Sequence, residues 1–345
     1  MKQGGRFALA WRILTYDRGR TVLAVTGVFL AILLVFVQLG FFIAVPRGGM
    51  LLYDRTRFDL LIASSDYEYQ VQPGAFPLSR LDQARVAPEV ALAAPFYFGM
   101  AKWRSGADGK APDVFVIGLD PNDRIFDSED INRQLAVLDQ ADTVLVDSMT
   151  RPMFGPLTTG RVVELNGDKV KIGGNYVLGT GFMGLGVILV SGQNFVRLFT
   201  YRQLGQVNLG LIQLKPGVDP NDGAASLRTL LGGGIQIFTP PELEAHETRY
   251  WTTRTSVGVL FGSGLMISFI VGVMVVYQIL ATQVSRQLPQ FATLKAVGYD
   301  DRFLSGTVIA IALLIVIAAF FRRWPPLWAF MPLSGAKLCS RSRCP

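Results

Sequence analysis

The chain has 345 residues, of which 50% are hydrophobic and only 17% are charged, and its formal net charge is +7. Soluble proteins average about 25% charged residues, so the composition argues against an ordinary soluble domain. The net positive charge lies in the segments that flank the apolar windows, whereas the long polar segment carries a small net negative charge, and this distribution argues against nucleic acid as a partner.

Asp, Glu, Lys and Arg are absent from three windows, 21–46, 255–285 and 303–321, which are 26, 31 and 19 residues long. A helix needs roughly 20 residues to span a bilayer, so the first two windows are long enough and the third is just long enough. A buried core helix usually has about 10–14 apolar residues, and a signal peptide has an apolar region of about 7–15. We therefore predict three permanent transmembrane helices.

Residues 1–20 carry five basic residues and one acidic residue. Phe7, Ala10, Trp11 and Leu14 share one helical face, which predicts an amphipathic helix in the cytoplasmic headgroup region. The alternative is a generic basic flank with accidental periodicity. By the positive-inside rule, the N-terminus is cytoplasmic. Segment 47–254, with 20 Lys and Arg against 23 Asp and Glu, then lies outside.

Segment 47–254 has the pattern of a mixed α/β domain. Strands are predicted at 58–64, 94–103, 113–120, 143–148 and 207–215, with a hairpin over 161–178 that turns at Asn166-Gly167. Helices are predicted at 130–139, 222–232 and 240–254, and the last continues into the second uncharged window without an obvious break. Cys339 and Cys344 both lie near the end of the chain, so this domain depends on its own apolar core.

No catalytic or metal-binding pattern stands out. His246, the one histidine, lies among Glu242, Glu244 and Glu247 on a helix face that we expect to be exposed. The carboxylates of 120–132 do not have EF-hand spacing, which favours a solvated loop over a calcium site. There is no Walker A motif, and the predicted spans hold no ionisable residue, which disfavours an ion-coupled carrier. We expect a non-catalytic chain with no cofactor.

Segment 286–302 is a polar turn between two predicted spans. Pro289 suits the first turn of a helix and Gly298 suits its left-handed end, so we predict a short helix from Pro289 to Val297. Asp300 or Asp301 then caps the third span. Such a helix suits docking into a partner's groove. An interfacial helix that touches only lipid is the alternative.

PQFATLKAVGYDDRFL (289–304) resembles the coupling segment of the FtsX/MacB family of ABC-transporter permeases. Further segments resemble the DevC-like branch of that family, among them FVIGLDPND (115–123), LVDSMTRPMFGP (145–156) and VELNGDKVKIGGNYVLG (163–179). The resemblance covers about residues 1–320. It implies an α-helical protein of the inner membrane with a large extracytoplasmic α/β domain.

The resemblance also implies a function: a non-catalytic permease subunit of an ABC exporter that works by mechanotransmission on a lipid-like or glycolipid-like substrate. The implied partners are a cytoplasmic ABC ATPase, a periplasmic membrane-fusion adaptor, an outer-membrane channel and a second copy of the chain. Carried over residue by residue, the ATPase contacts are Pro289, Phe291, Ala292, Leu294, Lys295, Ala296 and Gly298.

Two other functions are compatible with the pattern. The first is a mechanotransmitter that moves no substrate and regulates a periplasmic partner such as a cell-wall hydrolase. The second is a membrane-anchored sensor, which would need a signalling module that we do not find. A neighbouring adaptor gene would favour export, and a neighbouring hydrolase gene would favour the regulator.

Two features depart from the family. Gln290 stands where the family usually has Glu, and the family's fourth span is replaced by the basic, Pro-containing tail 322–345. We interpret the chain as a permease truncated or frameshifted after the third span, at 303–321; a genuine variant tail is the alternative.

The frameshift hypothesis makes a prediction about the gene. Another reading frame after codon 320 should encode a fourth apolar segment of about 20 residues. Sequencing the gene tests this directly. If neither of the other two frames encodes such a segment, the hypothesis is wrong.

Overall fold

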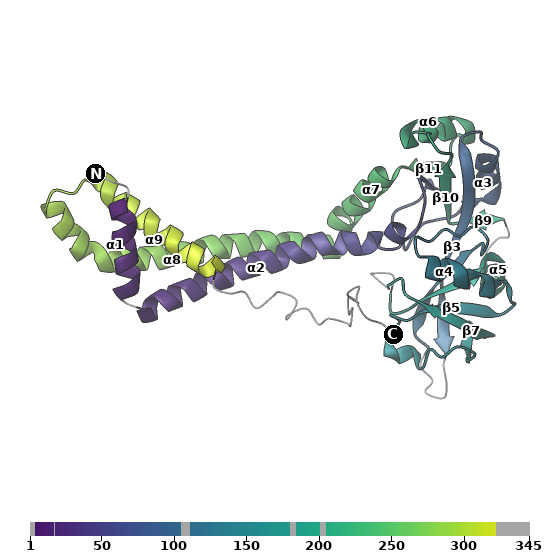
Figure 1. Ribbon diagram of the computed structural model, residues 1–345, viewed down its shortest axis with the longest axis horizontal. Helices are drawn as coiled ribbons and strands as arrows, with labels where there is room; N and C mark the ends of the chain where they lie inside the picture. The colour runs from purple at the N-terminus through teal and green to yellow at the C-terminus, as the bar shows by residue number, and fades with distance from the viewer. Residues whose placement is uncertain (1–3, 17, 105–110, 180–183, 201–204, 322–345) are drawn as a thin grey trace. The chain divides into compact units, whose positions relative to one another are not determined.

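The computed structural model describes residues 4–16, 18–104, 111–179, 184–200 and 205–321 (Figure 1). Its contacts divide the chain into two compact units. One unit is Phe42–Val259, and the other combines Met1–Phe41 with Leu260–Pro345. The predicted tail 322–345 lies outside the described residues.

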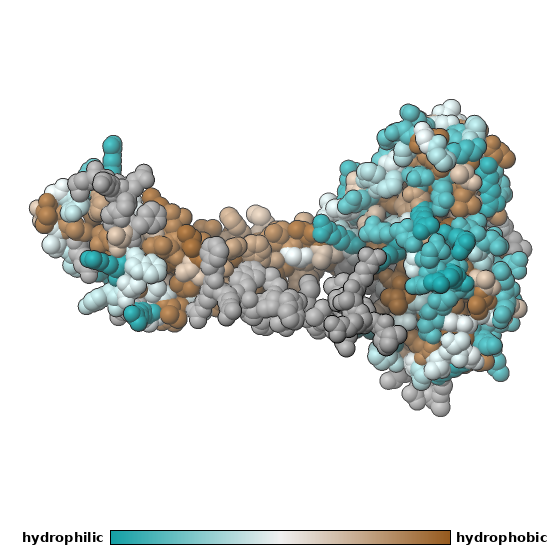
Figure 2. Space-filling view, in the orientation of Figure 1, coloured by the Kyte–Doolittle hydropathy of each residue, from teal (hydrophilic) through white to brown (hydrophobic). Residues whose placement is uncertain are grey.

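The second of these units is helical. Its helices are α1 (Gly4–Tyr16), most of α2 (Arg18–Met50), most of α8 (Ser256–Ala296) and α9 (Asp301–Phe321). Among the described residues, three stretches are long and apolar enough to cross a membrane: Thr21–Met50, Ser256–Pro289 and Arg302–Phe320. They overlap the three uncharged windows of the sequence, and hydrophobic side chains cover the surface of these helices (Figure 2).

Helix α1 packs against α9 through a narrow apolar stripe. Ala10 and Leu14 are buried in a cluster with Ile311 and Ile315. Trp11 is 61% exposed, so it does not belong to the buried face. The predicted helix is therefore present, and two residues of its predicted apolar face, Ala10 and Leu14, contact a neighbouring helix.

The unit Phe42–Val259 is a mixed α/β domain, as predicted. Its strands are β1 (Leu60–Ser64), β2 (Phe76–Pro77), β3 (Val90–Arg104), β4 (Asp113–Leu119), β5 (Thr143–Asp147), β6 (Val162–Leu165), β7 (Asp168–Tyr176), β8 (Val187–Ser191), β9 (Gln206–Val207), β10 (Leu209–Leu214) and β11 (Ile235–Phe238). Its helices are η1 (Tyr53–Arg55), α3 (Leu78–Arg85), α4 (Glu129–Gln134), η2 (Leu135–Asp139), η3 (Pro152–Phe154), α5 (Gly192–Leu198), α6 (Pro220–Leu231) and α7 (Pro240–Thr253).

Nine of these strands form one sheet in the order β11-β1-β10-β3-β4-β8-β5-β7-β6. The 15-residue strand β3 also pairs at its far end with β6, where Trp103 lies opposite Leu165. Strands β3, β4, β8, β5, β7 and β6 therefore close into a ring, while β10, β1 and β11 extend the sheet from β3. Closure satisfies edge hydrogen-bonding groups that an open sheet would expose.

The strands agree with their sequence pattern. The predicted strands 58–64, 113–120 and 143–148 correspond to β1, β4 and β5, and the hairpin over 161–178 is β6 and β7. The Asn166 side chain accepts a hydrogen bond from the Lys102 backbone N–H at 2.9 Å, which fixes the hairpin turn beside β3. Strands β8 and β11 and helices α3 and α5 were not predicted.

The closed ring makes a stability prediction. Trp103 is 1% exposed, packs edge-on against Phe154 and donates its indole N–H to the Phe154 carbonyl at 3.1 Å. Trp103→Ala should lower the unfolding free energy of the domain by about 3–5 kcal/mol, because it leaves a cavity and an unpaired carbonyl. Thermal unfolding of the purified chain measures this. Met100→Ala, on the same strand but 52% exposed, should change it by less than about 1 kcal/mol.

Candidate functional site

The predicted ATPase-coupling residues lie at the end of helix α8. The structure corrects one boundary: Pro289 lies inside α8 and does not begin a separate helix. Proline removes one backbone donor, and a long helix tolerates that loss when its hydrogen bonds continue on both sides. The Thr293 hydroxyl donates to the Pro289 carbonyl at 3.0 Å within this last stretch of the helix.

Gly298 ends the helix as predicted. Its φ is +100°, a left-handed conformation that favours glycine. The Gly298 N–H donates to the Lys295 carbonyl at 3.0 Å, and the Tyr299 N–H donates to the Leu294 carbonyl at 3.1 Å. This pair of hydrogen bonds is the Schellman motif, which satisfies carbonyls that the helix end leaves free. The stop is therefore local and sharply defined.

The coupling residues present a mostly exposed surface. Pro289, Ala292, Lys295, Ala296 and Gly298 are exposed, Leu294 is half-buried, and the Phe291 side chain lies outside the described residues. Leu288, Ala292 and Lys295 are spaced by four and three residues and so share one helix face. Leu288 is 57% exposed. This face therefore combines apolar groups with one cation.

The start of α8 differs from the expectation that helix 240–254 runs on into the second span. Helix α7 ends at Thr253, and α8 begins at Ser256. The Thr255 hydroxyl donates to the Trp251 carbonyl at 2.7 Å and accepts from the Gly258 N–H at 3.1 Å. Thr255 thus bonds to the end of one helix and caps the start of the next. The two helices are separate elements, and the Thr255 side chain hydrogen-bonds to both of them.

Gly258 permits this junction. A Cβ at position 258 would come 2.3 Å from the Trp251 carbonyl oxygen and 2.5 Å from that of Thr252. Both contacts are with backbone atoms, which cannot rotate away as a flexible side chain can. Any larger residue at 258 must therefore displace the end of α7 or the start of α8.

A buried carboxyl group fixes α7 to the α/β domain. Glu247 of α7 is fully buried, contrary to the exposed face that we expected. It accepts a short hydrogen bond from the Tyr67 hydroxyl, and the Tyr67 and Tyr53 hydroxyl oxygens are 2.8 Å apart. Tyr67 follows β1 and Tyr53 belongs to η1, so one polar network ties three segments together.

Burial raises the pKa of Glu247 to about 7, although hydrogen bonds from Tyr67, the Gln70 backbone and Trp251 act in the opposite direction. Burial likewise raises the pKa of Tyr67 and Tyr53, and the nearby Glu247 carboxylate adds to the effect. The tyrosines therefore remain hydroxyl donors, and Glu247 is the group in this network that titrates near neutral pH.

His246, the neighbour of Glu247, is half-buried and not on a solvated face. Its Nε2 lies 3.1 Å from the Glu68 carbonyl, and its ring packs beside Tyr67 and Phe238. Tyr69 stacks on Tyr250 of the same helix α7 with ring centroids 4.3 Å apart. The rings of His246 and Phe238 therefore pack against Tyr67, which donates to Glu247.

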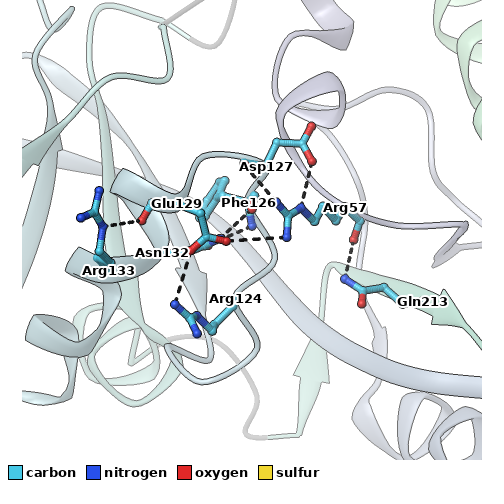
Figure 3. Close-up of polar contacts among 8 residues, drawn as sticks. All are labelled: Arg57, Arg124, Phe126, Asp127, Glu129, Asn132, Arg133 and Gln213. Carbon is cyan, nitrogen blue, oxygen red and sulfur yellow. Dashed lines mark hydrogen bonds and ion pairs between the residues drawn. The ribbon is translucent and has the colours of Figure 1, made fainter.

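Arginines pair with Asp127 and Glu129 in the acidic loop 120–132 (Figure 3). Arg57 pairs with Asp127 at 3.1 Å and with Glu129 at 3.9 Å, and Arg124 lies 3.5 Å from Glu129. Asn132 closes the loop through two hydrogen bonds with the Phe126 backbone. Within the described residues, no group of three or more His, Cys, Asp or Glu side chains is placed to hold a metal ion.

Residues 262–340 match the model of the FtsX-like permease C-terminal family, a range that contains the whole coupling segment and part of the tail. This match supports a permease of the FtsX/MacB type. It is compatible with an ABC-type permease or mechanotransmitter role, and members of that family are inner-membrane proteins with a periplasmic domain. They are generally non-catalytic and work with cytoplasmic ATPases and often with periplasmic adaptors.

Three solved structures are similar to about half of this chain. The periplasmic region of MacB from Actinobacillus actinomycetemcomitans matches at 12% identity and a TM-score of 0.39, covering 54% of this chain and 90% of that one. The extracellular domain of the transporter YknZ from Gram-positive bacteria matches at 12% identity and a TM-score of 0.37, covering 53% of this chain and 99% of that one. A domain of a putative permease from Porphyromonas gingivalis matches at 14% identity and a TM-score of 0.34, covering 53% of this chain and 87% of that one. No curated protein matches the chain.

The junction of the permease gives a packing prediction. Gly258→Ala should lower the unfolding free energy by about 1–3 kcal/mol, because the methyl group overlaps two backbone carbonyls. Thermal unfolding of the purified permease measures the effect. In Gly40→Ala, the added Cβ has nothing within 4 Å, so this variant should be neutral or slightly stabilising. Equal effects in both variants would contradict the packing at 258.

Glu247 makes the domain's stability depend on pH. Its folded-state pKa of about 7 exceeds the ordinary value of 4.5, so its contribution to stability is complete below pH 4.5 and is lost as the pH rises through 7. The loss amounts to about 3 kcal/mol. Glu247→Gln keeps a hydrogen-bond acceptor without the charge, and should flatten the stability profile between about pH 4.5 and 7. Unfolding midpoints of both proteins across this range measure the difference; parallel profiles would contradict the assignment.

Proposed function

We propose that this chain is the membrane subunit of an ABC-type exporter, in which a separate cytoplasmic ATPase drives motion of the extracytoplasmic domain. The family match over 262–340 carries the proposal, because it includes the exposed end of α8. A second copy of the chain, a periplasmic adaptor and an outer-membrane channel would complete the machine. A lipid-like or glycolipid-like substrate is the one that the DevC-like motifs favour.

The proposed coupling step uses the two ends of α8. The ATPase would dock on the surface that holds Ala292, Lys295 and Ala296, which are exposed. A displacement applied there would act on a helix that runs unbroken to Ser256. At its start the helix meets Thr255, whose hydrogen bonds reach Trp251 of α7, and α7 is tied to the α/β domain through Glu247. ATP-driven motion would thus reach the external domain with no path through the spans for substrate.

The docking surface is tested by co-purification with the ATPase. Lys295→Glu should reduce the retained ATPase by about tenfold or more, since a reversed charge in an interface costs several kcal/mol. Ala292→Asp should do the same by placing a charge in an apolar contact. Arg302→Glu is the matched control, because Arg302 is exposed and lies outside the seven coupling residues. Equal retention by Lys295→Glu and Arg302→Glu would contradict docking at this surface.

Leu294→Asp is a less selective probe, because Leu294 is half-buried and its replacement also disturbs packing.

The alternative function, a non-transporting regulator, predicts a different result in reconstituted vesicles. If the ATPase docks through Lys295 but reconstituted vesicles export no lipid-like substrate and a cell-wall hydrolase is activated, then the chain is a mechanotransmitter and not an exporter.

A further inference from the structure

A cavity of about 810 Å³ lies among helices α1, α2 and α8. Its apolar wall includes Leu9 and Ile13 of α1, Ala24 of α2, and Val275 and Ile279 of α8. The volume falls within the roughly 300–1,000 Å³ that is typical of small-molecule sites. All of its lining residues belong to the helical unit.

Two cations line the same cavity. Arg12 extends from α1 and Arg286 from α8, at the point where the uncharged window 255–285 ends. Both residues are exposed, and in the described part of the chain neither guanidinium has an ion-pair partner. Two arginines beside an apolar wall match an amphiphile with an anionic head, because the planar guanidinium group binds phosphate through paired hydrogen bonds.

Gln287 adds an independent polar requirement. It lines the cavity and is only 8% exposed, yet its Oε1 has no hydrogen-bond partner among the described residues. A buried acceptor without a donor is costly, and such groups in native proteins are usually satisfied by protein, water or ligand. The site therefore offers two positively charged hydrogen-bond donors, Arg12 and Arg286, and one acceptor, Gln287 Oε1, that needs a hydroxyl or another donor.

We propose that this cavity binds one anionic phospholipid. Arg12 and Arg286 hold the phosphate, a headgroup hydroxyl donates to Gln287 Oε1, and an acyl chain lies along Leu9, Ile13, Ala24, Val275 and Ile279. Bound there, the lipid fixes α1 against α8 immediately before the coupling segment. The proposal rests on the membrane placement in the proposed function, but not on the ATPase.

Titration of the purified full-length permease with phosphatidylglycerol, read by native mass spectrometry, tests the site. The double variant Arg12→Gln/Arg286→Gln should bind at least about tenfold more weakly. Arg12→Lys/Arg286→Lys should lose less, since the charge remains. Arg18→Gln/Arg302→Gln removes two exposed basic residues that do not line the cavity, and should bind as the wild type does. Equal weakening in the two Gln double variants would overturn the proposal, because it would mean nonspecific attraction.

Lipid chemistry provides the second arm of the test. Phosphatidylcholine should bind at least about tenfold more weakly than phosphatidylglycerol, and equal binding would overturn the anionic assignment. Inorganic phosphate should not compete at the concentrations at which the lipid binds; competition would assign the site to a free phosphate and not to a lipid. Gln287→Leu should weaken phosphatidylglycerol several-fold but not phosphatidic acid, which lacks the headgroup hydroxyls. Because no ATPase is present, failure here would leave the proposed coupling function intact.

Discussion

Helix termini leave backbone groups without partners, and the way α8 satisfies these groups at both ends determines how the rest of the permease can work. At its start, Thr255 caps the helix and bonds back to Trp251. At its end, Gly298 closes a Schellman motif. Both ends are therefore fixed by specific hydrogen bonds, and the 41 residues between them form one uninterrupted element. A helix with defined ends can pass on a displacement, whereas frayed ends would absorb it.

The external domain provides the fixed side of the junction. Its closed ring of strands is rigidified by buried residues such as Trp103, and Tyr67 extends from the segment after β1 to the carboxyl group of Glu247. A buried carboxyl group costs stability unless it is hydrogen-bonded or protonated, so the network is held together best when Glu247 carries a proton. The same residue therefore anchors α7 and makes the anchor sensitive to the pH outside the membrane in the proposed orientation.

Much of the fold was predictable because local patterns determine it. Uncharged windows indicated the three long helices, Asn166-Gly167 indicated a hairpin, and Gly298 indicated a helix end. The errors occurred where distant residues decide. Glu247 is buried because Tyr67, 180 residues away, donates to it, and no periodicity in α7 reveals that partner. The break at Thr255 depends on hydrogen bonds of its hydroxyl group, which the apolar sequence around it does not indicate. Pro289 fits inside α8 because the helix continues beyond it.

Hydrogen exchange at the α7–α8 junction is the most direct test of mechanical coupling. The permease would be reconstituted with its ATPase, and amide exchange over residues 247–258 compared with and without a non-hydrolysable ATP analogue. We predict that the nucleotide changes exchange at the junction in the wild type, and that Lys295→Glu abolishes the change. If the ATPase binds the analogue while the junction exchanges at the same rate, or if Lys295→Glu responds like the wild type, α8 does not couple the two ends.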